Sequence, residues 1–175
     1  KAARQSRRRE TNREVHLLRA ARGQPEGVLA FLGRGGVEEP GHDLKAWTDV
    51  LLTNTVGPML VTRAVLPALR RATGAKIAII ASHLGSSTLA KGGMYPYRAS
   101  KAAAINIATN LAVDLKPAGI AVAAFHPGWV QTDMGGKEAE TTIADSGAGL
   151  VERIDHLSLA TSGVFEDYRG ETFPF

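Results

Sequence analysis

Three short apolar runs, separated by two long amphipathic segments, constrain the fold of this chain more than any other feature. The runs are GVLAFLG (27–33), AKIAIIAS (75–82) and GIAVAAFH (119–126), each bounded by glycine, proline or polar residues. Apolar runs of this length are typical of strands that are buried on both faces. Residues 43–73 and 97–119 carry apolar side chains at helical spacing. Strands that alternate with long helices predict parallel βαβ units, and so an α/β fold with helices on both faces of the sheet.

The length and the charge distribution indicate one domain with a basic tail. At 175 residues, of which 44% are hydrophobic, the chain is long enough to bury one core. Residues 1–22 hold eight of the 21 lysines and arginines but two of the 17 acidic residues, so the positive excess lies at this end. We interpret residues 1–26 as a basic, poorly ordered tail and residues 27–175 as the folded portion. The alternative for the tail is a phosphate-binding arm or a targeting address. Nucleic acid is not an expected partner, because no base-reading fold accompanies the charge.

Several kinds of site and partner are disfavoured by what the sequence lacks. It has no cysteine, which excludes disulfides and thiolate metal sites, and its five histidines show no metal-ligand spacing. We therefore expect no metal. No uninterrupted apolar run approaches the roughly 20 residues that span a bilayer, and no secretory signal opens the sequence. We expect no membrane partner and a cytoplasmic location.

The stretch YPYRASKAA (95–103) contains a phenol and an amine at helical spacing. Tyr97 and Lys101 are four residues apart, so they share one face if the chain is helical from about Pro96. Tyr95 falls on another face. An ammonium one turn from a phenol, whose reference pKa is about 10, can stabilise the phenolate and make the pair useful for proton transfer. Coincidence is the alternative, because this spacing is a weak motif in isolation.

Polar residues follow two of the predicted strands. Ser82 ends the second run, and Pro127, Gly128 and Thr132 follow the third. Open parallel sheets bind their ligands beyond the carboxyl ends of the strands. These residues are therefore candidates for ligand binding, although ordinary turn chemistry is the alternative reading of Ser82.

Pro58 interrupts the hydrogen bonding of the predicted helix 43–73. Because proline has no N–H, the carbonyl of Asn54 loses its helical partner. The interruption would present a backbone acceptor beside the Asn54 amide at the level of the strand ends. A plain kink with a hydrated carbonyl is the alternative.

Four segments, in this order and at this spacing, resemble the short-chain dehydrogenase/reductase family and its carbonyl-reductase-like branch. They are NTVGP (54–58), IIASHLGS (79–86), YRASKAA (97–103) and HPGWVQTDM (126–134). The resemblance implies a Rossmann-like parallel sheet, of which residues 27–175 form the C-terminal portion. It also implies NAD or NADP as cofactor and a small-molecule carbonyl or alcohol as substrate.

The resemblance also implies a role for each candidate residue. Tyr97 would be the catalytic acid/base, and Lys101 would lower the pKa of Tyr97 and bind the nicotinamide ribose. Ser82 would hydrogen-bond the substrate carbonyl, with Ser86 as the weaker candidate. The main-chain carbonyl of Asn54 would hold a relay water. The implied catalytic set is Asn54, Ser82, Tyr97 and Lys101, and the implied cofactor-binding set is Tyr97, Lys101, Val130 and Thr132.

The N-terminal part of the family pattern is not matched. Family members begin with a strand, a turn of the type Thr-Gly-x-x-x-Gly-x-Gly and a helix whose N-terminus receives the pyrophosphate. Residues 1–26 hold no such pattern, so we expect the N-terminal βαβ portion to be missing or replaced. Two functions stay open: an NAD(P)-dependent oxidoreductase, or a truncated relative that acts as an interaction or regulatory module. Helices 43–73 and 97–119 are expected to serve in self-association, as their counterparts do in many relatives.

Overall fold

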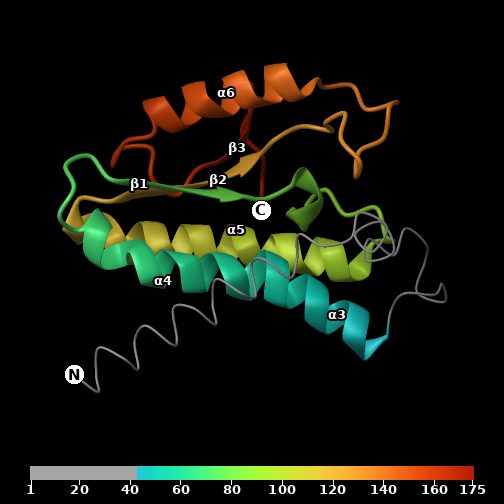
Figure 1. Cartoon of the computed structure of the whole chain (residues 1–175), viewed down its shortest axis with the longest axis horizontal. Helices are drawn as coiled ribbons and strands as arrows, with labels where there is room; N and C mark the ends of the chain where they lie inside the picture. Colours follow the sequence, from blue (N-terminus) through green and yellow to red (C-terminus); the bar gives the residue numbers. More distant parts are fainter. Residues whose placement is uncertain (1–42) are drawn as a thin grey trace.

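A computed structural model describes residues 43–175 and contains a three-stranded parallel sheet (Figure 1). The strands β1 (Lys76–Ile80), β2 (Ala121–His126) and β3 (Phe165–Asp167) lie side by side in that order. Within this part of the chain the predicted parallel α/β fold is confirmed. The predicted strand 27–33 and the predicted tail 1–26 lie outside the described residues.

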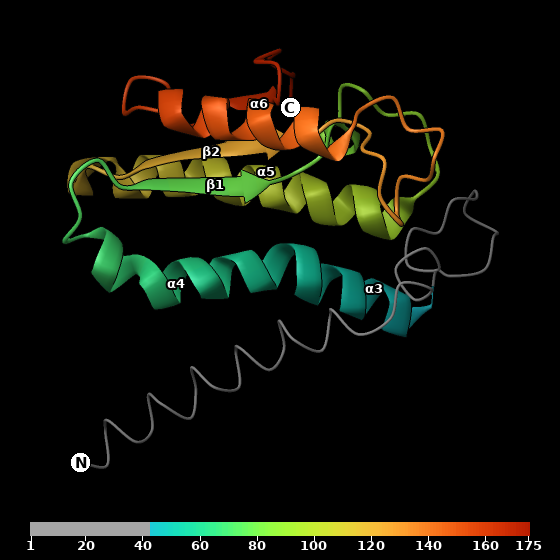
Figure 2. The ribbon, with the colours of Figure 1, turned by 45° about the horizontal axis from the view of Figure 1, so that its top comes forward.

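Helices cover both faces of the sheet, as Figure 2 shows. On one face α5 (Tyr95–Leu115) packs against β1 and β2, with Leu66 and Leu69 of α4 (Gly57–Leu69) at the edge of the same core cluster. On the other face Leu150 and Ile154 of α6 (Ile143–His156) pack against a second cluster. The alternating side chains of β2 divide between these clusters: Ala121, Ala123 and Phe125 face α6, and Val122 and Ala124 face α5. This central strand therefore holds the two layers together.

The predicted helix 43–73 is a continuous helical run with a π-helical turn inside it. It consists of α3 (Leu44–Leu51), the turn η1 (Leu52–Val56) and α4, and the run changes direction between α3 and α4 (Figure 1). Asp43 caps the first helix by accepting a hydrogen bond from the Ala46 N–H at 2.8 Å. Pro58 is the second residue of α4, directly after the π-helical turn and Gly57. The interruption expected at Asn54–Pro58 is present. It is a π-helical turn, which is wider than an α-helical turn, and not a simple proline kink.

The same helical run meets one criterion that the sequence analysis did not apply. By length and composition alone, Leu44–Leu69 could cross a membrane, and the core helix of a soluble protein passes the same test. The run was overlooked because Thr48, Asp49 and Asn54 break the apolar stretch into pieces. One such helix is weak evidence, and little of its apolar stretch is buried in the structure.

The connections that follow the three strands gather at one edge of the sheet. A short 3-10 turn, η2 (His83–Gly85), comes two residues after β1. The loop after β2 pairs Val130 with Thr141 before α6 begins. After β3 the chain folds back, so that the Phe173 N–H donates to the Phe165 carbonyl at 3.0 Å. Functional side chains at this edge are therefore contributed by three different connections.

Candidate active site

Ser82 lies at the carboxyl end of β1, where the sequence analysis expects a ligand. Its extended backbone caps η2, and its Oγ accepts a hydrogen bond from the Leu84 N–H at 3.2 Å. The side chain also lies close enough to Tyr97 to lower the pKa of its phenol, and Ser82 is 5% exposed. Ser82 thus makes the turn that was the alternative reading, and its role in ligand binding stays a prediction. Ser86, the weaker candidate, uses its Oγ to accept from the Leu89 N–H, at the far end of the turn.

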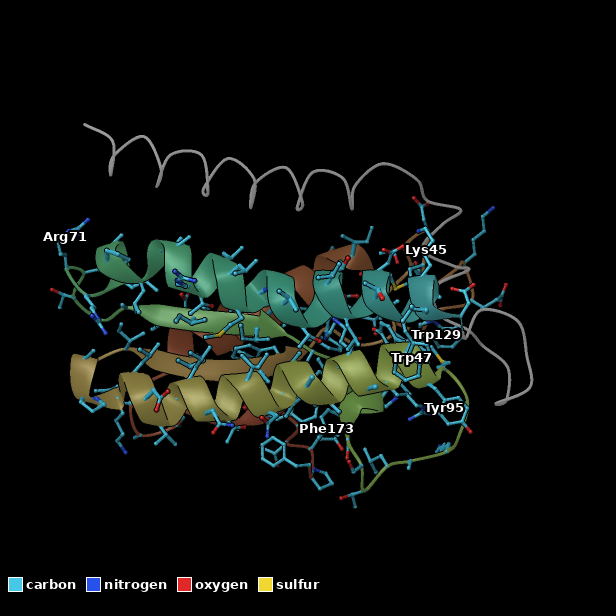
Figure 3. All side chains as sticks on the ribbon, turned by 90° about the horizontal axis from the view of Figure 1, so that it is seen from below. Lys45, Trp47, Arg71, Tyr95, Trp129 and Phe173 are labelled. Carbon is cyan, nitrogen blue, oxygen red and sulfur yellow. The ribbon has the colours of Figure 1, made fainter. Side chains whose placement is uncertain are left out.

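Tyr97 and Lys101 lie in the first two turns of α5, which begins earlier than the sequence predicts. The helix starts at Tyr95 because Met94 takes the left-handed conformation and Pro96 fits the first turn. Lys101 Nζ lies 5.7 Å from the centre of the Tyr97 ring. Tyr95 is 39% exposed and is labelled at the start of α5 in Figure 3. The two tyrosines therefore occupy different environments, and Tyr97 is the one beside Ser82 and Lys101.

Burial is the main cause of the pKa shifts of Tyr97 and Lys101. Burial raises the pKa of Tyr97 above its ordinary value, and the nearby Ser82 side chain offsets part of that rise. Burial lowers the pKa of Lys101 to about 8. The lowering of the Tyr97 pKa that the resemblance implies is not seen here. The Lys101 ammonium donates to the Ile80 carbonyl at 3.0 Å, so its charge is directed at β1 and not at the phenol oxygen.

Asn54 is tied to Tyr97 through a serine that the sequence analysis missed. The Asn54 side-chain amide donates to Ser100 Oγ at 3.0 Å, and Ser100 Oγ donates to the Tyr97 carbonyl at 2.7 Å. Thr55 Oγ1 adds a hydrogen bond to the Ser100 carbonyl at 3.2 Å. The π-helical turn is thereby fastened to the first turns of α5. Ser100 is fully buried, and a small polar residue between Tyr97 and Lys101 is the signal that could have revealed it.

The loop after β2 carries Val130 and Thr132. Thr132 Oγ1 accepts from the Gly135 N–H at 3.1 Å and donates to the Val130 carbonyl at 3.3 Å, which closes a tight turn. Gly128 has a φ of +86°, and a Cβ there would meet the Tyr168 ring at 2.8 Å, so this position needs glycine. Thr132 is exposed at the rim of the site. The backbone of this loop, together with the Thr132 hydroxyl, could hydrogen-bond a polar ligand group such as an amide or a phosphate.

The loop after β2 is also fixed to α6. Ser146 Oγ donates to the Pro127 carbonyl at 2.7 Å, and Ser146 is 5% exposed. Thr142 caps α6 by accepting from the Asp145 N–H at 3.1 Å. The position of Thr132 is therefore set by packing on both sides of the loop.

Two histidines that the sequence analysis did not single out lie next to the serine. His83 follows Ser82 and contacts His126, the last residue of β2, with Nδ1 and Nε2 2.8 Å apart. His83 and His126 are 43 residues apart in the sequence, so no local pattern reveals that they pair. Among residues 43–175 no group of three or more metal-ligating side chains occurs.

Known proteins share both the sequence and the fold of this chain. The sequence profile of the short chain dehydrogenase family matches residues 29–143. C-signal of Myxococcus xanthus is 42% identical over 123 residues, which cover 70% of this chain and 74% of C-signal. The 1-hydroxy-2-glutathionyl-2-methyl-3-butene dehydrogenase of Rhodococcus sp. (strain AD45) is 41% identical over 122 residues, covering 67% of this chain and 53% of that protein.

A solved structure aligns with most of the described chain. The NADPH-bound carbonyl reductase from chicken fatty liver superposes with a TM-score of 0.74 at 31% identity, covering 81% of this chain and 61% of that one. The chain therefore spans between about half and three quarters of the length of these relatives. The relatives extend beyond the region that they share with it.

Proposed function

Because the chain belongs to the short-chain dehydrogenase/reductase family, we propose that it carries the catalytic portion of an NAD(P)-dependent oxidoreductase that reduces a carbonyl or oxidises an alcohol. The observation that carries this proposal is the contact between Ser82 and Tyr97, with Lys101 beside the phenol ring. An acid and a hydrogen-bond donor that converge on one point suit a carbonyl oxygen, which must accept a proton as it is reduced. The comparisons give no support to the alternative of an interaction or regulatory module.

In the proposed reduction the protein handles the proton. When bound, the reduced nicotinamide supplies a hydride to the carbonyl carbon. Tyr97 donates its phenol proton to the carbonyl oxygen, and the Ser82 hydroxyl holds that oxygen in place. Because burial raises the pKa of Tyr97, the phenol is protonated at neutral pH and is ready to act as the acid. Lys101, 5.7 Å from the ring centre, supplies positive charge when the phenolate forms.

The chemistry of the donor groups fits the nicotinamide half of the cofactor. Tyr97 and Lys101 would bind the ribose hydroxyls, and the loop that carries Val130 and Thr132 would bind the carboxamide and a nearby phosphate. The exposed Thr132 hydroxyl and the glycine-dependent backbone at Gly128 support this assignment. NADPH in the chicken carbonyl reductase and NADP in a Burkholderia multivorans short-chain dehydrogenase/reductase support a nicotinamide cofactor, without deciding between NAD and NADP.

Replacing the phenol tests the proposal. In a form of the protein that shows reductase activity, Tyr97→Phe should lower kcat by about two orders of magnitude or more, the range expected when a general acid is lost. Tyr95→Phe is the matched control, since Tyr95 begins the same helix but is 39% exposed. Steady-state kinetics with a panel of small carbonyl substrates and NADPH or NADH would measure both. Equal losses in the two variants, or full activity in Tyr97→Phe, would rule the assignment out.

A further inference from the structure

The two connections that hold the proposed serine and the proposed cofactor loop are joined by a pair of histidines. His83 is the first residue of η2, directly after Ser82, and His126 ends β2, directly before Pro127. Their ring nitrogens, Nδ1 of His83 and Nε2 of His126, are 2.8 Å apart, and the ring centres are 4.5 Å apart at an interplanar angle of 63°. This is a hydrogen bond between two side chains from neighbouring strand ends.

An aromatic ring packs against both histidines. The ring of Phe173, labelled in Figure 3, lies 6.2 Å from the His83 ring and 5.8 Å from the His126 ring, and it also contacts Phe165 at 5.5 Å. His126 is 8% exposed, and His83 is partly buried. A hydrogen bond in such surroundings competes little with water, so it is stronger than the same bond at the surface.

The direction of this hydrogen bond follows from the other ring nitrogen of His126, Nδ1. Nδ1 of His126 is buried and has no hydrogen-bond partner among residues 43–175. A proton on that atom would be an unsatisfied buried donor, whereas a bare lone pair costs less because carbonyl-like acceptors are more often left unpaired. The proton of His126 therefore lies on Nε2 and is donated to Nδ1 of His83, which in turn carries its own proton on Nε2.

The charges around the pair keep it neutral. Burial, with added repulsion from His83, Arg169 and Lys101 and partial opposition from Asp167, lowers the pKa of His126 to about 4. Burial also lowers the pKa of His83, with added repulsion from Arg98 and Lys91. Both pKa values lie below neutrality, so the hydrogen bond joins two neutral rings at neutral pH.

We propose that the His83–His126 pair positions Ser82 for its contact with Tyr97, by fastening η2 to the end of β2. The expected effect on kcat rests on the proposed function, whereas the expected effect on the position of η2 does not. Ser82 Oγ caps η2 by accepting from the Leu84 N–H, so any shift of η2 moves the hydroxyl. The other attachments of η2 run to α5, through Arg98 Nη1 to the Leu84 carbonyl at 3.3 Å and through Gly85 against the helix backbone. The histidine pair adds a side-chain bond between η2 and the sheet, next to the backbone bond in which the Ala81 N–H donates to the Phe125 carbonyl at 2.8 Å.

The first test needs no enzyme activity. In the full chain labelled with 15N, long-range proton–nitrogen spectra should show His126 neutral with its proton on Nε2 from pH 6 to pH 8. Amide exchange of Leu84, which reports the cap on Ser82, should quicken at least tenfold in His126→Leu. In His126→Gln, whose amide can donate from the same position, it should stay near the wild-type rate. A charged His126 at pH 6, or unchanged exchange at Leu84 in His126→Leu, would overturn the inference. Should His126→Leu fail to fold, His83→Leu removes the same bond at a less buried position.

The second test asks whether the pair acts through the serine. In a form with reductase activity, His126→Leu should lower kcat about tenfold with little change in the KM for NADPH, and His126→Gln should recover most of the loss. In a Ser82→Ala background, His126→Leu should lower kcat by less than twofold further, because the positioned hydroxyl is already gone. Full additivity of the two substitutions would overturn the positioning role. A form that binds the cofactor and still has no reductase activity would refute the proposed function, while the exchange measurement would still decide the role of the pair.

Discussion

Burial favours the uncharged form of both titratable side chains beside Ser82. The Tyr97 phenol keeps its proton to a higher pH than a free phenol, and Lys101 gives up its proton at about pH 8. Near neutrality the pair is therefore a protonated phenol beside a lysine that is still mostly charged. This is the state that a reduction needs, with the acid loaded and a positive charge nearby.

The lowered pKa of Lys101 predicts how stability changes with pH. The folded pKa of about 8 lies below the ordinary lysine value of 10.5, so between these values the unfolded chain binds more protons and the free energy of unfolding rises with pH. From pH 7.5 to 9.5, below the tyrosine range, we expect a rise of about 1 to 3 kcal/mol. Urea denaturation of wild type and Lys101→Met would measure it. The variant should lack this rise, and parallel curves for the two proteins would contradict the prediction.

At the level of elements, the site depends on how closely η2 approaches α5. Gly85 is buried, and a Cβ built on it would lie 2.6 Å from the Lys101 carbonyl carbon and 2.8 Å from the Ala102 nitrogen. Both are backbone atoms of a packed helix, so neither can move aside cheaply. The glycine thus lets the turn that carries Ser82 lie directly on the helix that carries Tyr97.

A methyl group at this position should separate the two elements. We expect Gly85→Ala to lower the free energy of unfolding by about 1 to 3 kcal/mol, the usual cost of overpacking, and to reduce kcat by moving Ser82 away from Tyr97. Gly147→Ala is the matched control: it lies inside α6, and a Cβ there meets nothing within 4 Å. The control should be neutral or stabilising by up to about 1 kcal/mol. Denaturation of both variants measures this, and equal effects would argue against the close approach.

The periodicity of the sequence located the elements that are buried on both sides. Strands β1 and β2 and helix α5 were predicted because their apolar residues recur at regular spacing over five residues or more. Strand β3 was not, because three residues that end in Glu166 and Asp167 give no apolar run. Helix α6 was not predicted, because its two glycines, Gly147 and Gly149, lower the helix propensity of the segment. A Cβ on Gly149 would collide with the Tyr168 carbonyl, so helix propensity there yields to packing.

The candidate site likewise has a part that the sequence predicted and a part that depends on the fold. The order of four short motifs pointed to Ser82, Tyr97 and Lys101, and the structure brings these three side chains together. The hydrogen bond between His83 and His126 depends on the register of β1 against β2, which the sequence does not display. Burial decides the direction of the Tyr97 pKa, and burial too is set by the whole fold.

Across the whole molecule, the helical run Leu44–Leu69 leaves apolar side chains exposed. Leu52, Val56, Met59, Val61 and Val65 are 39–43% exposed in the structure. Helix α5 was also expected to serve in self-association, but its Ala108 is 1% exposed and packs in the sheet core, so this small residue is not available at a surface. Apolar side chains on α4 are the better candidates for contact with a second copy.

We expect this surface to mediate self-association at micromolar concentration. Val61→Glu with Val65→Glu would place two charges in the contact and should shift the sedimentation coefficient toward that of the monomer. Val113→Glu is the control, because Val113 lies on α5 and is 70% exposed. A wild-type chain that sediments as a monomer would contradict the prediction, as would an equal shift in the control.

The last prediction concerns cofactor affinity, which depends on a part of the fold beyond the three described strands. In the described sheet β1 lies at the edge, so the nicotinamide-binding groups Tyr97 and Lys101 stand beside the outermost strand. In the family fold the crevice that receives the dinucleotide is completed by further strands and by a glycine-rich turn before a helix. The printed sequence contains no turn of that type. Without it, the pyrophosphate loses two or three charge-assisted hydrogen bonds, each worth roughly 1.5 to 3 kcal/mol.

We therefore expect the 175-residue chain to bind NADPH several orders of magnitude more weakly than a complete site would, and to turn over slowly if at all. Titration of NADPH fluorescence with the purified chain measures the dissociation constant. A micromolar value would overturn the prediction and would mean that basic side chains replace the missing donors. Arg34 and the arginines of residues 1–22 are the candidates for such a replacement. Arg34→Ala would then weaken binding at low salt more than at high salt, because an exposed arginine binds phosphate mainly through screened charge.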